Sequence, residues 1–142
     1  MLKTRIAFVF GAILLTGILS CSIPGDVRRA KEEVIAIRAL IKAKNIEQIY
    51  RDASAEFRDA ARKSDLEDIF EGHYDEIGNT ENFELLQTKF EKESPDGPFL
   101  LILGYKAKST TSAINLDEFI FLIKDGNPRL FNYRYELRSE NK

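Results

Sequence analysis

The fold is decided by residues 117–137, DEFIFLIKDGNPRLFNYRYEL. At its centre, an Asp-Gly pair followed by Asn-Pro separates two runs rich in Phe, Ile and Tyr, a pattern typical of a β-hairpin with a tight turn. After the turn, apolar and polar side chains alternate. The apolar set is Phe131, Tyr133, Tyr135 and Leu137, and the polar set is Asn132, Arg134 and Glu136. The alternation predicts a strand with one buried face and one wet face.

Two more turn signals extend this hairpin towards the N-terminus. They are the sequence SPDGP at 94–98 and the sequence TTS at 110–112. The segments between the turns are rich in the residues that strands prefer. We therefore expect four antiparallel strands, near residues 82–92, 99–109, 114–124 and 129–138.

The residues before Gly78 follow a helical period instead. A first helix begins after a cap at Asp26, and its apolar stripe is widened by Leu40 and Ile35. The stripe consists of Val27, Ala30, Val34, Ile37 and Ile41. Asn45 indicates the end of this helix and the N-cap of a second short helix that starts at Ile46.

A further helix is marked at both ends. Ser64 and Glu67 have the spacing of a capping box, and Gly78 supplies the residue type that commonly ends a helix. The segment 55–61 is either a separate short helix or a continuation of the second one. Helices followed by a meander predict an α+β domain, with the N-terminal helices packed on one face of a four-stranded antiparallel sheet.

The first 21 residues resemble a bacterial lipoprotein signal. A basic start and an uncharged run at 6–19 precede Ser20 and the only cysteine, Cys21, and residues 18–21 (Ile-Leu-Ser-Cys) are similar to a lipobox. As a helix the uncharged run would reach about 21 Å, short of the ~30 Å hydrocarbon core. A permanent membrane-spanning helix is therefore the poorer interpretation.

This resemblance implies cleavage between Ser20 and Cys21, diacylation of the Cys21 thiol and acylation of the new amino end. The three chains, palmitate among them, would form a firm lipid anchor. The alternatives are a plain secretory signal with a chance cysteine and an uncleaved anchor. Ser22 stands where an inner-membrane retention signal would have Asp, which implies the outer membrane, facing the periplasm, in a Gram-negative host. The inner membrane and the cell surface are the alternatives. The expected organisation is a signal peptide at 1–20, the lipidated cysteine and a short tether at 21–25, and a single domain at 26–142.

The charge balance argues against nucleic acid as a partner. The chain has 21 basic and 23 acidic side chains, and the leader contains two of the basic ones. Binding to phosphate backbones needs a basic stripe, and none is present in the sequence.

The whole pattern resembles small bacterial lipoproteins of unknown function with a nuclear transport factor 2-like (cystatin-like cone) domain. The resemblance rests on the order of helices, the capped helix that ends at Gly78, and the hairpin at 124–133. Pro128 and Arg129 stand where that family has a Trp after the turn. The resemblance covers about residues 27–138 and implies a fold, but no specific activity.

The sequence offers little for catalysis, metal binding or a cofactor. His73 is the only imidazole, and we expect it to pack beside the helical stripe; a lone His does not make a zinc site. No nucleophile motif or phosphate-binding glycine loop is present. The isomerase-like enzymes of the cone superfamily imply one alternative, in which Asp117 or Glu118 acts with Tyr133 or Tyr135. We expect these carboxylates to be solvated at the rim of the strand.

Two non-enzymatic sites complete the expectations, and both suit a lipid-anchored binding or accessory module of the cell envelope. One is a hollow between helices and sheet that takes a small molecule or lipid fragment and is lined by Tyr50, Phe57, His73 and Tyr133. The other is an apolar patch on the opposite face of the sheet. It would pair with a second copy or another envelope protein, unless the sheet curls and buries it. The patch consists of Leu100, Ile102, Ile120 and Leu122.

Overall fold

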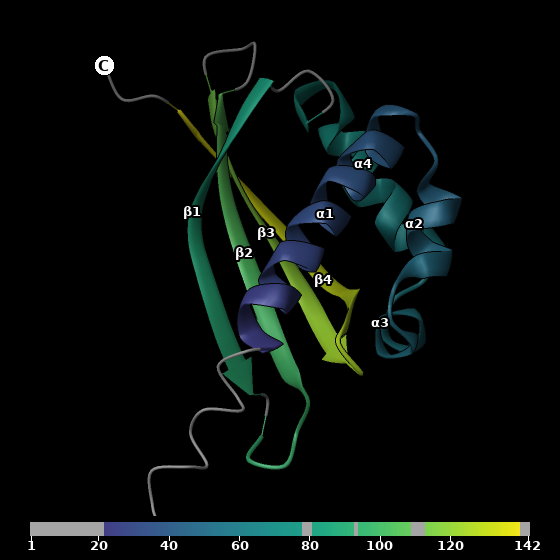
Figure 1. Cartoon of the computed structure of the whole chain (residues 1–142). Coiled ribbons are helices and arrows are strands. Elements are labelled where there is room, and N and C mark those ends of the chain that lie inside the picture. The colour runs from purple at the N-terminus through teal and green to yellow at the C-terminus, as the bar shows by residue number, and fades with distance from the viewer. Residues whose placement is uncertain (1–21, 78–80, 93, 109–112, 140–142) are drawn as a thin grey trace, which may run out of the picture.

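The part of the chain that the structure describes forms four helices followed by a four-stranded antiparallel sheet, as the computed structural model in Figure 1 shows. The structure describes residues 22–77, 81–92, 94–108 and 113–139. Within these ranges the side chains of 22–24, 72–77, 81, 108, 113 and 139 are not described. The expected signal peptide, Cys21 and Gly78 lie outside the described residues, as does the side chain of His73.

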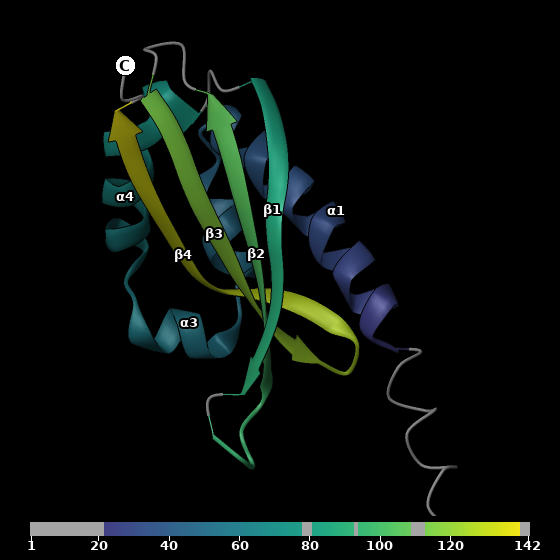
Figure 2. The same ribbon diagram turned by 90° about the vertical axis from the view of Figure 1, so that its left-hand side faces the viewer.

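The sheet is the expected meander. Its strands β1 (Glu81–Lys92), β2 (Phe99–Lys108), β3 (Ala113–Lys124) and β4 (Asn127–Ser139) pair antiparallel in the order β1-β2-β3-β4. The β3–β4 turn has Asp125 at φ 52° and Gly126 at φ 71°, the left-handed pair that a tight two-residue hairpin requires. All helices lie on one face of the sheet (Figures 1 and 2), so the coarse α+β prediction is confirmed.

Helix α1 (Ser22–Lys42) crosses the sheet and buries the expected stripe. Ala30, Val34, Ile37 and Ile41 are buried, and Val27 and Leu40 pack against the same core. Ile35, however, is 69% exposed, so its assignment to the stripe was wrong. Helical geometry places position 35 beyond the edge of the buried sector.

The start of α1 also differs from the prediction. The helix begins at Ser22 and not after Asp26, so residues 22–25, expected as a tether, form its first turn. Proline is tolerated in the first turn of a helix, because the amide hydrogen that it lacks has no partner there anyway. The domain therefore continues without a break to the residue after Cys21.

The turn after α1 is a Schellman motif with an unusual residue. The amide of Lys44 donates to the carbonyl of Ile41 and that of Asn45 donates to Leu40, both at 2.9 Å. Lys44 adopts φ 56°, where glycine is the usual residue. As predicted, Asn45 caps α2 (Ile46–Asp52), because its Oδ1 accepts from the amide of Gln48 at 3.2 Å.

The remaining helices settle two open boundaries. Segment 55–61 is mostly a separate helix, α3 (Ala55–Ala60), capped by Ser54. α4 spans Lys63–Ile77, and the predicted Ser64–Glu67 capping box is wrong. Asp65 accepts from the backbone amide of Arg62 at 2.8 Å instead, two positions earlier than the pattern indicated.

The core lies between the helices and one face of the sheet. Phe119 and Phe121 of β3 and Leu101 and Leu103 of β2 meet Phe70 of α4 and the α1 stripe there. No helix of the part that the structure describes is long and apolar enough to cross a membrane.

The opposite face of the sheet holds a second, smaller apolar cluster. Its members are Leu100, Ile102, Ile120 and Leu122, with Phe131 packed against them. A bulge lies in the β3–β4 pairing, because Ile120 pairs with Asn132 and Phe121 with Leu130, which leaves Phe131 as the extra residue. Bulges bend a strand, and β4 bends across the sheet in Figure 2.

The strained turn after α1 yields a first prediction. Lys44→Gly should raise the free energy of unfolding by about 0.5–1 kcal/mol, because glycine adopts a positive φ without the clash that a Cβ causes. Lys31→Gly, in the exposed middle of the same helix, should lower it by about 1 kcal/mol. Urea unfolding followed by circular dichroism measures both, and equal destabilisation by the two variants would contradict the assignment of strain to Lys44.

Candidate functional site

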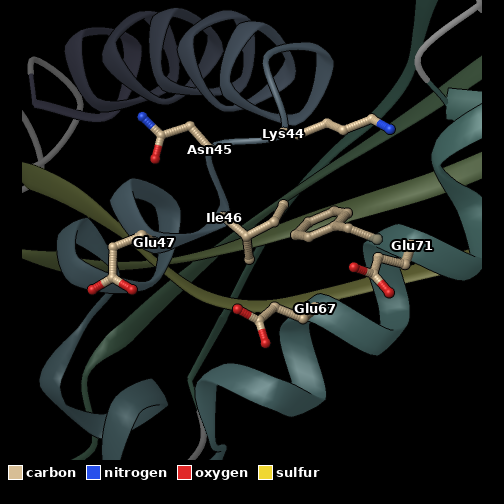
Figure 3. Close-up of a pocket in the computed structure, with 7 residues that line it drawn as sticks. Lys44, Asn45, Ile46, Glu47, Glu67 and Glu71 are labelled. Atoms are coloured by element: carbon tan, nitrogen blue, oxygen red, sulfur yellow. The ribbon is translucent and has the colours of Figure 1, made fainter.

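A pocket of about 440 Å³ lies where the turn after α1 and the start of α2 face α4. Figure 3 shows Glu67 and Glu71 of α4 opposite Ile46 and Glu47 of α2. Ile46 and Phe70 are buried and form an apolar floor. The other lining residues are polar or charged: Lys44, Asn45, Glu47, Glu67 and Glu71.

The charges around this pocket are only partly compensated. Lys63 donates to Glu47 at 2.8 Å and lies 3.5 Å from Glu67. The hydrogen bond to Lys63 lowers the pKa of Glu47, and the same bond raises the pKa of Lys63. Glu67 and Glu71 are one helical turn apart on α4, and like charges at that spacing repel each other. Lys44 also lines the pocket, so three carboxylates face two lysines and the pocket keeps a net negative charge of one.

A buried polar cluster lies beneath α1, on the inner face of the sheet. Nη2 of Arg38 is 3.1 Å from both carboxylate oxygens of Asp117, and the Tyr133 hydroxyl donates to Asp117 at 3.5 Å. The side chain of Asp117 is fully buried, and that of Arg38 is 12% exposed. The pair joins residues 79 positions apart in the chain.

Three aromatic rings surround the guanidinium group of Arg38. Its Cζ lies 3.2 Å from the ring centroid of Phe83, 5.2 Å from that of Tyr105 and 5.1 Å from that of Phe119. A cation over ring faces is attracted by their quadrupoles, most strongly when water is excluded. The rings thus replace part of the hydration that Arg38 loses.

Burial dominates the electrostatics of this cluster. It raises the pKa of the Asp117 carboxyl above its ordinary value of 3.8, although Arg38 and Tyr133 both donate to it. It also lowers the pKa of Arg38 and raises that of Tyr133. The ion pair is therefore held in place at the expense of desolvating both partners.

Some polar atoms of this region have no partner. Among the described residues, Nε and Nη1 of Arg38 and both amide atoms of Asn115 are buried without a hydrogen bond. Asn115 is two residues before Asp117 and therefore on the same face of β3. Unsatisfied buried groups of this kind cost about 1–3 kcal/mol each, so this part of the core is not optimised for stability.

The pocket and the polar cluster are connected through two aromatic rings. Phe70 forms part of the pocket floor, and its ring centroid lies 5.2 Å from that of Tyr133. The ring centroid of Tyr133 in turn lies 5.0 Å from that of Phe119, and the Tyr133 hydroxyl donates to Asp117. Tyr133 therefore links the pocket floor at Phe70 to the Arg38–Asp117 pair.

The residues predicted to line a hollow do not line this pocket. The ring centroids of Tyr50 and Phe57 lie 6.2 Å apart. The Tyr50 hydroxyl donates to the carbonyls of Arg58 and Ala61. Tyr133 is a core residue, and the side chain of His73 is outside the described residues. The helical period located Tyr50 and Phe57 on buried faces, but it could not tell which faces border open space.

The expectation that both carboxylates at 117 and 118 are solvated was wrong for Asp117. It is 1% exposed, whereas Glu118 accepts from Gln87 at 3.0 Å on the other face of the sheet. The isomerase-like alternative named Asp117 and Tyr133, and these two do lie together. Sequence reasoning missed Arg38 and Asn115, although a polar residue at every second position before Phe119 signals polar groups on the inner face.

The predicted outer patch forms a cluster but offers little open surface. Leu100, Ile102, Ile120 and Leu122 are each at most 8% exposed within the chain. Pairing through them would require neighbouring side chains such as Phe131 to move aside. The partner surface therefore stays a prediction.

Within the ranges that the structure describes, no group of three or more His, Cys, Asp or Glu side chains is arranged to hold a metal ion. Of the three pocket glutamates, Glu47 of α2 and Glu67 of α4 share the Lys63 ammonium.

The raised pKa of Asp117 gives a prediction about pH. Since the folded state holds the Asp117 proton more tightly than the unfolded state, ionisation of this carboxyl weakens folding as the pH rises. The free energy of unfolding of the wild type minus that of Asp117→Asn should therefore fall as the pH rises above 3.8, and level off once the carboxyl is ionised.

Urea unfolding between pH 3 and pH 8 measures this difference. Asp96→Asn, in the exposed turn before β2, controls for the loss of one carboxylate. A difference that rises with pH would show that Arg38, and not burial, sets the pKa of Asp117.

A comparison of the chain with known protein families, with curated proteins and with solved structures finds no match.

Proposed function

We propose that this protein is a lipid-anchored, non-enzymatic binding module of the bacterial cell envelope, with a cone-like domain that binds a small cationic molecule. The pocket between α2 and α4 carries the proposal. Its volume of about 440 Å³ is within the range typical of small-molecule sites. Its apolar floor and charged rim match a ligand with a short apolar part and a charged head.

The charge of the pocket selects the class of ligand. Glu47, Glu67 and Glu71 line it together with Lys44, and Lys63 contacts Glu47 and Glu67, so the three carboxylates outnumber the two lysines by one. A primary ammonium group between Glu67 and Glu71 would relieve their repulsion and gain charge-assisted hydrogen bonds. Its alkyl part would lie on Ile46 and Phe70, so the proposed ligand is an alkylamine or a molecule that ends in one.

Binding of a simple probe tests this ligand class. We expect n-pentylamine to shift the backbone amide resonances of Ile46, Phe70 and Glu71 in a two-dimensional NMR titration, and pentanoate to leave them unchanged. Glu67→Gln and Glu71→Gln should each weaken binding about two- to fivefold, the usual range for one partly exposed charge.

Asp68→Asn is the matched control, because Asp68 is an exposed carboxylate on the same helix and does not line the pocket. It should leave the affinity for n-pentylamine unchanged. Equal shifts with pentylamine and pentanoate, or equal losses in all three variants, would contradict the proposed site.

The lipid anchor rests on the lipobox-like residues 18–21 and has its own test. Full-length protein expressed in a Gram-negative host should incorporate radiolabelled palmitate and fractionate with the outer membrane. Cys21→Ser should lose the label and accumulate with its leader uncleaved, because the acylated thiol is the signal for processing. An unlabelled wild-type protein in the soluble fraction would rule out the anchor.

The isomerase-like alternative is weaker. A substrate would have to reach Asp117, whose side chain is fully buried and whose oxygens are both 3.1 Å from Arg38. The proximity of Tyr133 to Asp117 is explained by core packing, since Tyr133 also contacts Phe70 and Phe119. We therefore assign the polar cluster to positioning α1, and the pocket to function.

A further inference from the structure

The end of the domain at which α1 begins also carries the β1–β2 turn and the β3–β4 turn. In Figures 1 and 2 the start of α1, the β3–β4 turn and the β1–β2 turn lie at the same end, with the β1–β2 turn furthest out. A contact fixes the first two together, because Nη1 of Arg29 donates to the carbonyl of Gly126 at 2.6 Å. Any group attached at position 21 therefore leaves the domain next to these turns.

No linker residue separates position 21 from helix α1. α1 begins at Ser22, so the residue expected to carry the lipid is the direct neighbour of a helix that is packed on the sheet. A flexible linker would let the domain tumble above the bilayer, whereas a helix fixes the direction in which the chain leaves it. If Cys21 is acylated as proposed above, this end of the domain faces the membrane.

The outermost turn exposes an aromatic side chain. Phe99, the first residue of β2, is 48% exposed, although it is large and apolar. Nζ of Lys92 lies 4.5 Å from its ring centroid and donates to the carbonyl of Pro95 at 3.1 Å. An exposed ring beside a lysine is the combination that lies at bilayer interfaces, with the ring among the upper acyl chains and the ammonium at the headgroups.

We infer that the turn formed by Lys92, Pro95, Pro98 and Phe99 is a second membrane contact that orients the anchored domain on a lipid surface. The inference rests on the proposed lipid anchor. Charge does not drive this contact, because the basic residues at this end, such as Arg28 and Lys124, are accompanied by Asp26, Glu32, Asp96 and Asp125. The contact therefore forms on zwitterionic lipid as well as on anionic lipid.

The absence of tryptophan from the chain makes a direct test possible. Phe99→Trp introduces a single reporter into the full-length protein, which is lipidated in cells, purified and reconstituted into phosphatidylcholine vesicles with or without bromine on the acyl chains. Bromine quenches only nearby tryptophan. We expect the brominated vesicles to reduce the emission of Phe99→Trp about twofold or more, as for a residue at interface depth.

Leu137→Trp is the matched control, since Leu137 is 40% exposed near the opposite end of the sheet. It should be quenched by less than about a fifth, because the domain holds it away from the bilayer. Pro98→Trp, in the same turn as Phe99, gives a second reporter if the Phe99 variant does not fold.

The outcomes separate this inference from the proposal on which it rests. Vesicles that carry the acylated protein but do not quench Phe99→Trp or Pro98→Trp overturn the membrane contact and leave the anchor intact. Equal quenching at positions 99 and 137 also overturns it, because the domain would then have no fixed orientation. A purified protein without acyl mass that does not float with the vesicles overturns both.

Discussion

The buried ion pair between Arg38 and Asp117 is the constraint on which the arrangement of the domain depends. A stripe of Ala, Val and Ile can slide or rotate on an apolar sheet at little cost, but a guanidinium group can satisfy a buried carboxylate from one position only. Burying both charges is unfavourable, and moving either partner would leave the other without compensation, which costs several kcal/mol. The pair and the three rings around Arg38 therefore fix where α1 crosses β1, β2 and β3.

The position of α1 then determines the pocket. The helix ends in a strained turn at Lys44, and this turn and the start of α2 form one wall of the pocket opposite α4. Phe70 belongs both to the floor and to the aromatic contacts that reach Tyr133 and Asp117. The unpartnered polar atoms of Arg38 and Asn115 indicate that this connection is not packed for maximal stability.

Local patterns were enough to predict the elements, but not the contacts between them. The Asp-Gly turn, the alternation in β4 and the α1 stripe depend on residues a few positions apart, and the structure has the strands within two residues of where they were expected. Arg38 and Asp117 are 79 positions apart, so neither one alone reveals the other. Arg38 does lie one turn from both Val34 and Ile41, within the buried sector, and Asp117 is in phase with Phe119. The positions of Arg38 and Asp117 within these buried, periodic patterns were the evidence for the pair that the sequence contained.

Hydrophobicity alone does not say where a side chain lies. Ile35 was assigned to the α1 stripe, and Tyr50 and Phe57 were expected to line a hollow, because hydrophobicity indicates that a side chain prefers burial but not what is available to cover it. The outer cluster of the sheet was expected to pair with a partner unless the sheet curled and buried it. The bulge at Phe131, which depends on the pairing of two strands, turns one more ring onto it.

The length of α1 sets the distance between the proposed anchor and the pocket. The helix has 21 residues and is therefore about 30 Å long. Its first residue follows the proposed anchor, while the turn after its last residue forms the rim of the pocket. A bilayer contact at the β1–β2 turn would thus hold the pocket roughly one helix length above the lipid surface. A ligand drawn out of the membrane would have to cross that distance through water, whereas a soluble amine would meet the pocket directly. The geometry of one helix therefore favours a water-soluble cation over a lipid fragment.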